Sequence, residues 1–232
     1  MGLLRIYIGY DEREAVGYPV FCSSVLRRTR ERVSFEPMRG VRREASSTGF
    51  DHTRWDVPGL CGYRGIALWA ECDMLARADV AELLDLFDPR YDVMLVPHDY
   101  RTKYPVKFLG QKNEDYPRKN QSSFMLFNNS AAVWQRLDEL RRQKPVNPGN
   151  LHAFPKFMHG TQLFEDDRIG ALPMEWNWLS LEYDHNPDAK IVHHTIGLPC
   201  WEPYATIDPY ADEWRAEREA MLAHAPDGIS RG

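Results

Sequence analysis

The chain has 232 residues, and 43% of them are hydrophobic, which is enough to form a sizeable buried core. Its formal net charge of -5 argues against nucleic acid as a partner, because proteins that follow a phosphate backbone usually carry a basic excess. No apolar run approaches the roughly 20 residues that a membrane-spanning helix needs. We therefore expect one domain without a membrane span, acting on a small substrate.

The cysteines indicate the redox environment. Cys22, Cys61, Cys72 and Cys200 show no CxxC spacing, and the first residues do not form an apolar segment with a cleavage site. This pattern predicts free thiols and a cytoplasmic location.

Apolar segments with strand and helix patterns alternate along the first 145 residues. The expected strands are Leu3–Tyr10, Val33–Met38, the extended stretch Gly65–Leu75, Tyr91–Pro97, Ser122–Asn128, Ile169–Pro173 and Ala189–His194. The expected helices are Tyr18–Arg30, Ala78–Asp88, Ser130–Gln143 and Tyr210–Ala223. Tyr91–Pro97 has the continuous apolar content of a buried parallel strand. The alternation predicts an α/β fold with helices on both faces of one sheet.

Polar segments follow several of these strands directly. They are Tyr10-Asp11, Glu71-Cys72-Asp73 and Pro97-His98-Asp99. Ligands of open α/β sheets bind beyond the carboxyl ends of the strands. We therefore expect these segments to share one edge of the sheet.

Glu71 and Asp73 are the strongest candidates for a metal site. On an extended segment their side chains point the same way, so both could reach one divalent cation or its water shell. They follow the apolar run Ile66–Ala70, where acids lose hydration unless a cation meets them. Two solvated acids at a strand end explain the spacing equally well.

Two further segments could contribute to a site. His193 and His194 follow an apolar strand, and because adjacent strand residues face opposite sides, only one can face a given site. Arg118, Lys119 and Asn120 precede another strand, where they could bind a diphosphate and hydroxyl groups. A solvated basic loop is the alternative for this second segment.

The order of these segments resembles the GT-A glycosyltransferases, and specifically the group similar to glycogenin and the bacterial galactosyltransferases. The resemblance extends from Ile6 to Trp201. Ala70–Met74 stands where this family has Asp-x-Asp, and His193–Trp201 resembles its His-x-x-Gly-x-x-Lys-Pro-Trp segment. The other matching segments are Tyr7–Asp11, Thr53-Arg54 with Val57-Pro58, Asn120–Asn128, and Ile169–Pro173 followed by Trp176-Asn177.

The resemblance implies a mixed, mostly parallel GT-A sheet in a single domain. That domain would have a nucleotide-binding half at 1–100, a sugar and acceptor half at 101–205 and a C-terminal helix and tail at 206–232. It implies metal-dependent transfer of a sugar from a nucleotide-diphosphate sugar, such as a UDP-sugar, to an unknown saccharide or other acceptor, with retention of configuration. An inverting reaction would need a general base among the acids near the site.

The resemblance also implies roles for individual residues. Glu71, Asp73 and His193 would hold Mn²⁺ or Mg²⁺. Gln162, Asp166 and Asp167 would lie near the reacting face of the sugar. The donor would contact Tyr10, Asp11, Arg54, Lys107, Arg118, Lys119, Asn120, Trp176, Asn177 and Gly197.

The sequence departs from the family pattern in three ways. Glu71 stands where Asp is usual, so both direct and water-mediated contact with a cation remain open. His194 has the family's spacing to Gly197, but His193 is preferred because it ends the apolar run. The family's C-terminal lysine is absent, so its phosphate contact would pass to the basic residues Lys107, Arg118 or Lys119.

Other functions fit parts of the sequence. A sugar nucleotidyltransferase would share the fold and the acids, but it usually opens with a Gly-rich basic loop, and Gly9–Arg13 is not such a loop. A catalytically silent carbohydrate-binding homologue would agree with the aromatic content of 12% and with the altered first acid.

Overall fold

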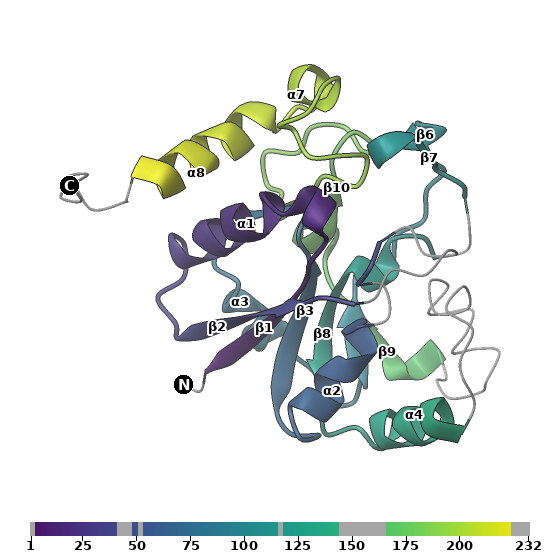
Figure 1. The fold of residues 1–232 in the computed structure, drawn as a ribbon. Coiled ribbons are helices and arrows are strands. Elements are labelled where there is room, and N and C mark those ends of the chain that lie inside the picture. The colour runs from purple at the N-terminus through teal and green to yellow at the C-terminus, as the bar shows by residue number, and fades with distance from the viewer. Residues whose placement is uncertain (1–2, 41–47, 51–52, 116–117, 144–165, 224–232) are drawn as a thin grey trace, which may run out of the picture.

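The computed structural model describes residues 3–40, 48–50, 53–115, 118–143 and 166–223. Its central sheet has six strands in the order β2-β1-β3-β8-β5-β9 (Figure 1). All run in the same direction except β8, which is antiparallel to both of its neighbours. The predicted mixed, mostly parallel α/β sheet is therefore confirmed. The strands are β1 (Leu4–Gly9), β2 (Val33–Met38), β3 (Ile66–Glu71), β5 (Val93–Leu95), β8 (Phe124–Asn128) and β9 (Ile169–Ala171).

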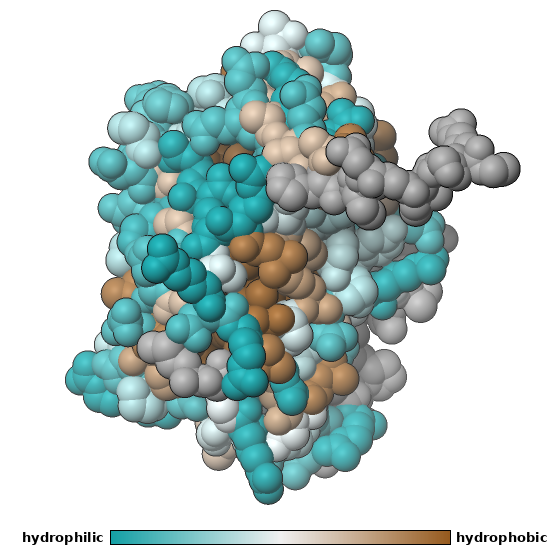
Figure 2. All heavy atoms as spheres, turned by 90° about the vertical axis from the view of Figure 1, so that its left-hand side faces the viewer, coloured by the Kyte–Doolittle hydropathy of each residue, from teal (hydrophilic) through white to brown (hydrophobic). Residues whose placement is uncertain are grey.

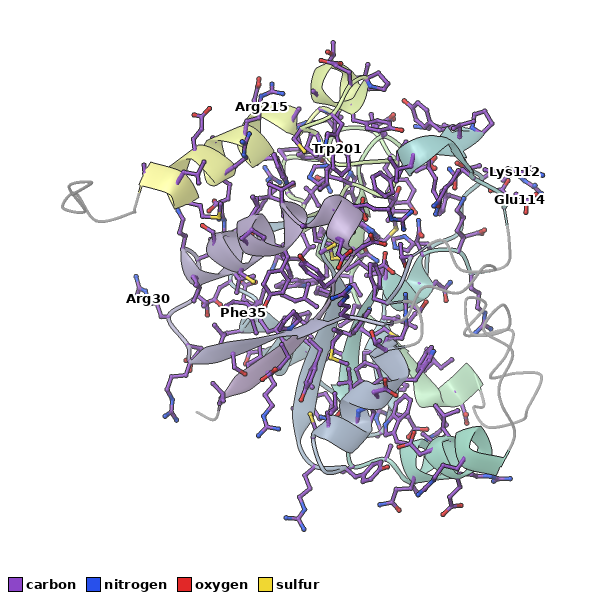
Figure 3. The ribbon with its side chains drawn as sticks, in the orientation of Figure 1. Arg30, Phe35, Lys112, Glu114, Trp201 and Arg215 are labelled. Carbon is purple, nitrogen blue, oxygen red and sulfur yellow. The ribbon has the colours of Figure 1, made fainter. Side chains whose placement is uncertain are left out.

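Two smaller sheets lie beside the central one. The first joins β10 (Trp178–Leu179), β11 (Ile191–His193) and β4 (Met74–Ala76), with β11 antiparallel to β4. The second is the hairpin of β6 (Val106–Lys107) and β7 (Gln111–Lys112). Lys112, which ends β7, and Glu114, two residues later, project away from the molecule (Figure 3).

Helices cover both faces of the central sheet. In Figure 1, α1 and α8 lie together above it, and α2 and α4 lie on the opposite side. The contacts agree, because α1 packs on α8 and β4 whereas α2 packs on α4 and β3. The helices are α1 (Gly17–Leu26), α2 (Val57–Leu60), α3 (Glu82–Leu86), α4 (Ala132–Gln143), α7 (Tyr204–Ile207) and α8 (Ala211–Ala223).

Single turns of 3-10 helix connect these elements. They are η1 (Glu12–Glu14), η2 (Thr53–Asp56), η3 (Phe108–Gly110), η4 (Gln121–Ser123), η5 (Asp166–Arg168) and η6 (Met174–Asn177).

The core explains why the strand sequences are so apolar. Ala67–Ala70 of β3 is completely buried, because β3 lies between β1 and β8 and is covered on both faces. A second apolar cluster, which includes Val20, Leu75, Val192 and Trp214, joins α1, β4, β11 and α8. This cluster fixes the small sheet, and with it the end of β11, against the first helix.

Several predicted elements differ from the observed ones. Gly65–Leu75 is not one strand, because the chain turns at Cys72–Asp73 and continues in another sheet as β4. The predicted parallel strand at Tyr91–Pro97 is shorter, and β5 has one parallel neighbour and one antiparallel neighbour. The first predicted helix ends at Leu26 rather than Arg30.

A shallow apolar groove lies between α1, β2 and α8, lined by side chains that include Leu26, Phe35 and Met221. Figure 2 shows apolar side chains gathered in the middle of the left-hand face of Figure 1. Among the described helices, none combines the length and apolarity that a membrane crossing requires. All four cysteines are free thiols. The cytoplasmic location stays a prediction.

Candidate active site

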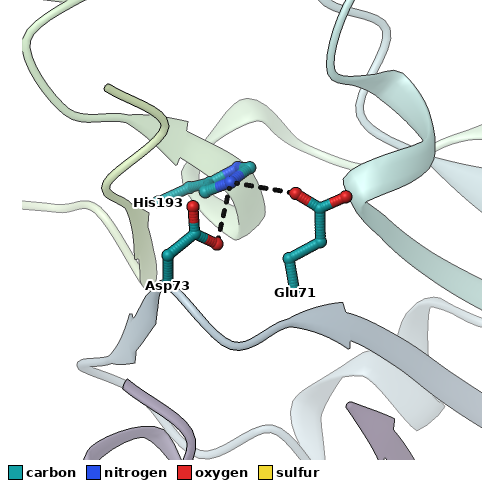
Figure 4. Close-up of side chains that lie close together, drawn as sticks. All are labelled: Glu71, Asp73 and His193. Atoms are coloured by element: carbon teal, nitrogen blue, oxygen red, sulfur yellow. Dashed lines mark ion pairs between the residues drawn. The ribbon is translucent and has the colours of Figure 1, made fainter. Parts of the chain in front are cut away.

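Three side chains from two sheets converge at one point (Figure 4). Glu71 ends β3, Asp73 lies in the turn before β4, and His193 ends β11. The Nε2 atom of His193 lies 3.2 Å from Asp73 Oδ1 and 3.6 Å from Glu71 Oε2. One potential ligand atom from each residue lies within 4.8 Å of the others. The turn at Cys72–Asp73 creates this arrangement, because it passes the chain from β3 to the sheet that contains β11.

The two adjacent histidines face opposite sides. His193 Nδ1 lies 3.0 Å from Asn177 Oδ1 and 3.3 Å from Ser123 Oγ, which directs Nε2 toward the acids. His194 Nδ1 instead lies 2.9 Å from Asp208 Oδ2, away from Glu71 and Asp73. Of the two histidines, the geometry therefore brings only His193 to the acids.

The environment of His193 favours its charged form in the metal-free protein. Burial by itself would lower the pKa of His193, but the carboxylates of Asp73 and Glu71 outweigh burial and raise this pKa to about 9. Without a bound cation, the imidazolium is therefore a counter-ion for the two acids at neutral pH.

Arg54 fixes Glu71 from the other side. Its Nη2 donates to Glu71 Oε1 at 2.8 Å, and its Nη1 donates to Ser122 Oγ at 3.0 Å. The guanidinium is almost completely buried and lies 5.3 Å from the ring centroid of Trp69. The sequence placed Arg54 near the donor, and the structure places it at the wall of the same pocket, bound to Glu71.

A polar pocket surrounds the three converging side chains. Lys107 and Asn120, both expected at the donor, also line it. Trp201 (Figure 3) stacks on Phe108 with ring centroids 5.1 Å apart, so the segment after β11 supports one wall. The other lining residues are Glu14, Thr48, Phe50, Arg54, Phe108, Gln111, Ser122, Ser123 and Thr195.

Sequence reasoning missed Glu14, although a signal for it was present. Glu14 follows the carboxyl end of β1, the same position in the sheet that singled out Tyr10 and Asp11. Burial raises the pKa of Glu14 well above its usual range, and the charges of Asp73, Asp11 and Glu71 add to the effect. Phe108, Gln111 and Thr195 carry no comparable sequence signal.

Tyr10 and Asp11 line a neighbouring hollow together with Arg13 and Arg39. Asp11 accepts two bonds from the Arg13 guanidinium, at 2.9 Å and 2.6 Å. Burial opposes ionisation of Asp11, but these bonds outweigh it and lower the pKa of Asp11.

Several predicted donor residues lie elsewhere. Lys119 is buried with its Nζ 2.5 Å from Asn113 Oδ1, and with Arg118 it lines a separate hollow beside Tyr100. Trp176 is buried in the core, and Asn177 is buried behind His193. These four side chains do not line the pocket around the acids.

Gly197 has a packing role in the structure. A Cβ atom at this position would lie 2.3 Å from the ring of Tyr204, so a side chain would displace α7. Its backbone N–H donates to the His194 carbonyl at 3.0 Å, which closes the turn after β11.

The structure places Asp166 and Asp167 away from Glu71, so their predicted position near the reacting face stays a prediction. Both residues belong to η5, which precedes β9, and β9 runs parallel to β5 and in the same direction as β3. They therefore lie at the amino ends of the strands, whereas Glu71 lies at a carboxyl end. Arg168, the next residue, bonds Asp92 at the start of β5 at 2.6 Å. Gln162 lies outside the described residues.

Comparison with known proteins places the chain in a family. No family model matches the sequence. Protein CDI of Arabidopsis thaliana is 34% identical over 232 residues, a match that covers 93% of this chain and 86% of the relative. At this identity and coverage the two proteins are members of one family.

Solved structures share the fold at much lower identity. The bifunctional glycosyltransferase WbbM has a TM-score of 0.62 at 13% identity, with 95% of this chain and 51% of that chain covered. The glycosyltransferase GlyE of Streptococcus pneumoniae has a TM-score of 0.62 at 11% identity, over 96% of this chain and 63% of that chain. This chain therefore spans about half the length of WbbM and under two thirds of GlyE.

A third structure matches along nearly its whole length. The galactosyltransferase LgtC, solved with donor and acceptor sugar analogs, has a TM-score of 0.56 at 11% identity over 94% of this chain and 96% of that chain. The predicted resemblance to the GT-A glycosyltransferases is thus confirmed at the level of the fold. The chain belongs to the family of Arabidopsis Protein CDI, and its fold is that of the GT-A glycosyltransferases.

Proposed function

We propose that this protein is a glycosyltransferase that moves a sugar from a nucleotide-diphosphate sugar, of the UDP-sugar class, to a saccharide or other acceptor with the help of Mn²⁺ or Mg²⁺. The observation that carries this proposal is the convergence of Glu71, Asp73 and His193 in a polar pocket at the carboxyl end of β3. A metal and diphosphate site at this edge is what the shared fold leads us to expect.

The donor groups at this point fit a divalent cation. Asp73 Oδ1 is buried and, within the described residues, forms no hydrogen bond, although His193 Nε2 lies 3.2 Å away; it is therefore available as an oxygen ligand. Two carboxylates and one imidazole form a mixed oxygen and nitrogen set, which favours Mn²⁺ or Mg²⁺ over Zn²⁺. Zn²⁺ sites are typically richer in sulfur ligands. Arg54 binds Glu71 Oε1 and leaves Oε2 facing His193, so Glu71 contacts the cation directly or through water.

The cation, when bound, neutralises charge that develops on the departing diphosphate. The residues of the chain prepare this site. Asn177 and Ser123 hold His193 Nδ1, which fixes the ring and leaves Nε2 as the ligand atom. Lys107, at the pocket wall, supplies a positive charge for phosphate oxygens, and Asn120 supplies amide groups for hydroxyls. Retention of configuration is part of the proposal through the GT-A resemblance.

The first test is hydrolysis of a panel of UDP- and GDP-sugars with and without Mn²⁺. We expect metal-stimulated release of nucleoside diphosphate from one donor. Release of pyrophosphate from a nucleoside triphosphate and a sugar phosphate would instead indicate a nucleotidyltransferase. Saccharide binding without turnover of any donor would indicate a catalytically silent homologue and would contradict both enzymatic functions.

The site itself is tested by Asp73→Asn. This change removes a ligand charge but keeps the shape of the side chain, so metal-stimulated turnover should fall by about 100-fold or more. The Tm of the metal-free protein should fall at neutral pH but the protein should stay folded, because Asp73 no longer pairs with the His193 imidazolium while Glu71 still does. Asp85→Asn on the exposed face of α3 is the matched control and should retain turnover. Unfolding of Asp73→Asn, with the control folded, would make Asp73 a structural residue and place the site elsewhere.

A further inference from the structure

The pocket contains a fourth acidic side chain that the proposed function does not use. Glu14 is the last residue of η1, is 4% exposed, and lines the same pocket as Glu71, Asp73 and His193. Its backbone N–H donates to the Asp11 carbonyl at 3.0 Å, which closes the single turn and fixes where Glu14 lies.

Sheet register explains why Glu14 lies near the acids. β1 and β3 are parallel neighbours, and Gly9 at the end of β1 is paired with Glu71 at the end of β3. The two chains therefore leave the sheet side by side at the same edge. α1 then begins directly against the turn before β4, since a Cβ atom on Gly17 would lie 2.5 Å from the Cys72 carbonyl oxygen. η1 is held between β1 and this contact.

Among the residues that the structure describes, no cationic side chain forms an ion pair with the Glu14 carboxyl. Its neighbour Arg13 forms two bonds with Asp11, and the cationic groups that reach the other two acids are Arg54 and His193. In the described part of the chain, no donor bonds the Glu14 carboxyl. A nearly buried acid without a donor costs free energy unless a positive group or a polarised water meets it.

The position of Glu14 decides which contact is feasible. The potential ligand atoms of Glu71, Asp73 and His193 lie within 4.8 Å of one another, and Glu14 is not part of that group. The Glu14 carboxylate is therefore better placed to contact the same cation through water than to ligate it directly. Mg²⁺ and Mn²⁺ retain several water ligands in protein sites, and an acceptor that binds such waters raises the affinity for the cation.

We propose that Glu14 is a cation-positioning residue whose carboxylate accepts hydrogen bonds from the water ligands of the divalent cation held by Glu71, Asp73 and His193. This inference rests on the proposed metal site and adds a residue to it. The role differs from that of Arg54 and Asn177, which orient protein ligands rather than water.

The experiment is a titration of the full, metal-free chain with Mn²⁺, in which electron paramagnetic resonance measures the free ion, followed by competition with Mg²⁺. Glu14→Gln keeps the shape of the side chain and removes its charge. It should weaken Mn²⁺ binding by about 10-fold or more. The Tm of the metal-free protein should not fall, because a neutral amide avoids the cost of a buried carboxylate beside Glu71 and Asp73.

Glu12→Gln is the matched control. Glu12 belongs to the same turn and carries the same charge, but it is exposed and pairs with Arg39 rather than lining the pocket. Removal of the Glu12 charge should change the Kd for Mn²⁺ by less than about twofold, since an exposed charge is screened by solvent and salt.

The outcomes separate this inference from the proposed function. If the wild-type protein binds Mn²⁺ and folded Glu14→Gln binds it equally well, the role of Glu14 is refuted and the metal site stands. If the wild-type protein binds neither Mn²⁺ nor Mg²⁺, the metal site and the inference both fail. If Glu14→Gln does not fold, Glu14→Asp replaces it. The shorter arm should weaken binding at least threefold, and unchanged affinity would overturn the inference.

Discussion

At the scale of single residues, two neighbouring histidines have different surroundings although they share a strand end. His193 lies between two acids and an amide, and its Nε2 faces the pocket. His194 is completely buried and bonds Asp208, which also accepts from Ser180 at 2.5 Å and from the backbone of Tyr210 at 2.8 Å. His194 therefore connects β11 to the start of α8.

Separate replacement of these histidines should give different results. His194→Ala leaves the buried Asp208 carboxylate without the imidazole that contacts its Oδ2, so unfolding free energy should fall by about 1–3 kcal/mol. Surviving folded protein should still bind Mn²⁺ with wild-type affinity. His193→Ala should lose Mn²⁺ binding and the rise in Tm that Mn²⁺ produces. Thermal unfolding with and without Mn²⁺ measures both effects, and loss of binding in His194→Ala alone would reverse the assignment.

At the scale of elements, the sequence located the strands better than it located their partners. β2 has the predicted bounds Val33–Met38, because a short β-prone run is bounded by polar residues on both sides. The break at Cys72–Asp73 was not predictable, because Met74 and Leu75 continue the apolar pattern into another sheet. Because the residues before and after the turn are both buried, their apolar sequence looks the same as that of one long strand.

The candidate site was predicted to the extent that it depends on strand ends. The acids and the histidine come together because each follows an apolar strand, which is a local signal. Asp167 lies away from Glu71 because the direction of β9 depends on its pairing with β5, which no local pattern encodes. Lys119 lies away from the acids because its bond to Asn113 directs the side chain, and no local pattern encodes that bond.

The contact between α1 and the Cys72–Asp73 turn yields an element-scale prediction. Gly17→Ala would place a methyl group 2.5 Å from the Cys72 carbonyl oxygen, so either α1 or the turn must move. We expect a loss of about 1–3 kcal/mol in unfolding free energy and weaker Mn²⁺ binding. Denaturant unfolding and Mn²⁺ titration measure the two effects.

The control for this prediction is Gly59→Ala in α2. An added Cβ atom there would meet first the flexible end of Asp138, at 3.3 Å. It should change stability by less than about 1 kcal/mol and leave Mn²⁺ affinity unaltered. Equal Mn²⁺ affinity in Gly17→Ala and the wild type would show that the turn tolerates displacement without moving Asp73.

At the scale of the whole molecule, the cation site joins parts of the chain that are far apart in sequence. Glu71 belongs to the central sheet, His193 to the small sheet, and the second apolar cluster holds the small sheet against α1 and α8. A cation bound by both sheets would therefore stabilise the folded state as a whole. At a concentration 100 times its Kd, such a ligand contributes about 2.7 kcal/mol. The division into 1–100, 101–205 and 206–232 stays a prediction.

This linkage makes stability depend on pH in opposite ways with and without the cation. In the metal-free protein the pKa of His193 is raised from 6.5 to about 9, so the folded state binds its proton more tightly than the unfolded state does. The interaction of the His193 imidazolium with Asp73 and Glu71 therefore adds on the order of 3 kcal/mol to the unfolding free energy. This contribution is fully present below pH 6.5 and is lost as the pH rises through about 9. A cation instead requires neutral His193, and its binding releases the proton.

We therefore expect the Tm measured in EDTA to fall between pH 6 and pH 8.5, whereas the increase in Tm produced by Mn²⁺ should grow over the same interval. His193→Asn cannot bind the proton in this range, so it should flatten the dependence measured in EDTA and remove most of the growth seen with Mn²⁺. Protein with Asp85→Asn should behave as the wild type, because that carboxylate is exposed and does not line the pocket around the acids. If the effect of Mn²⁺ is the same at every pH in the wild type, proton release from His193 does not accompany binding, and the cation is held without the imidazole.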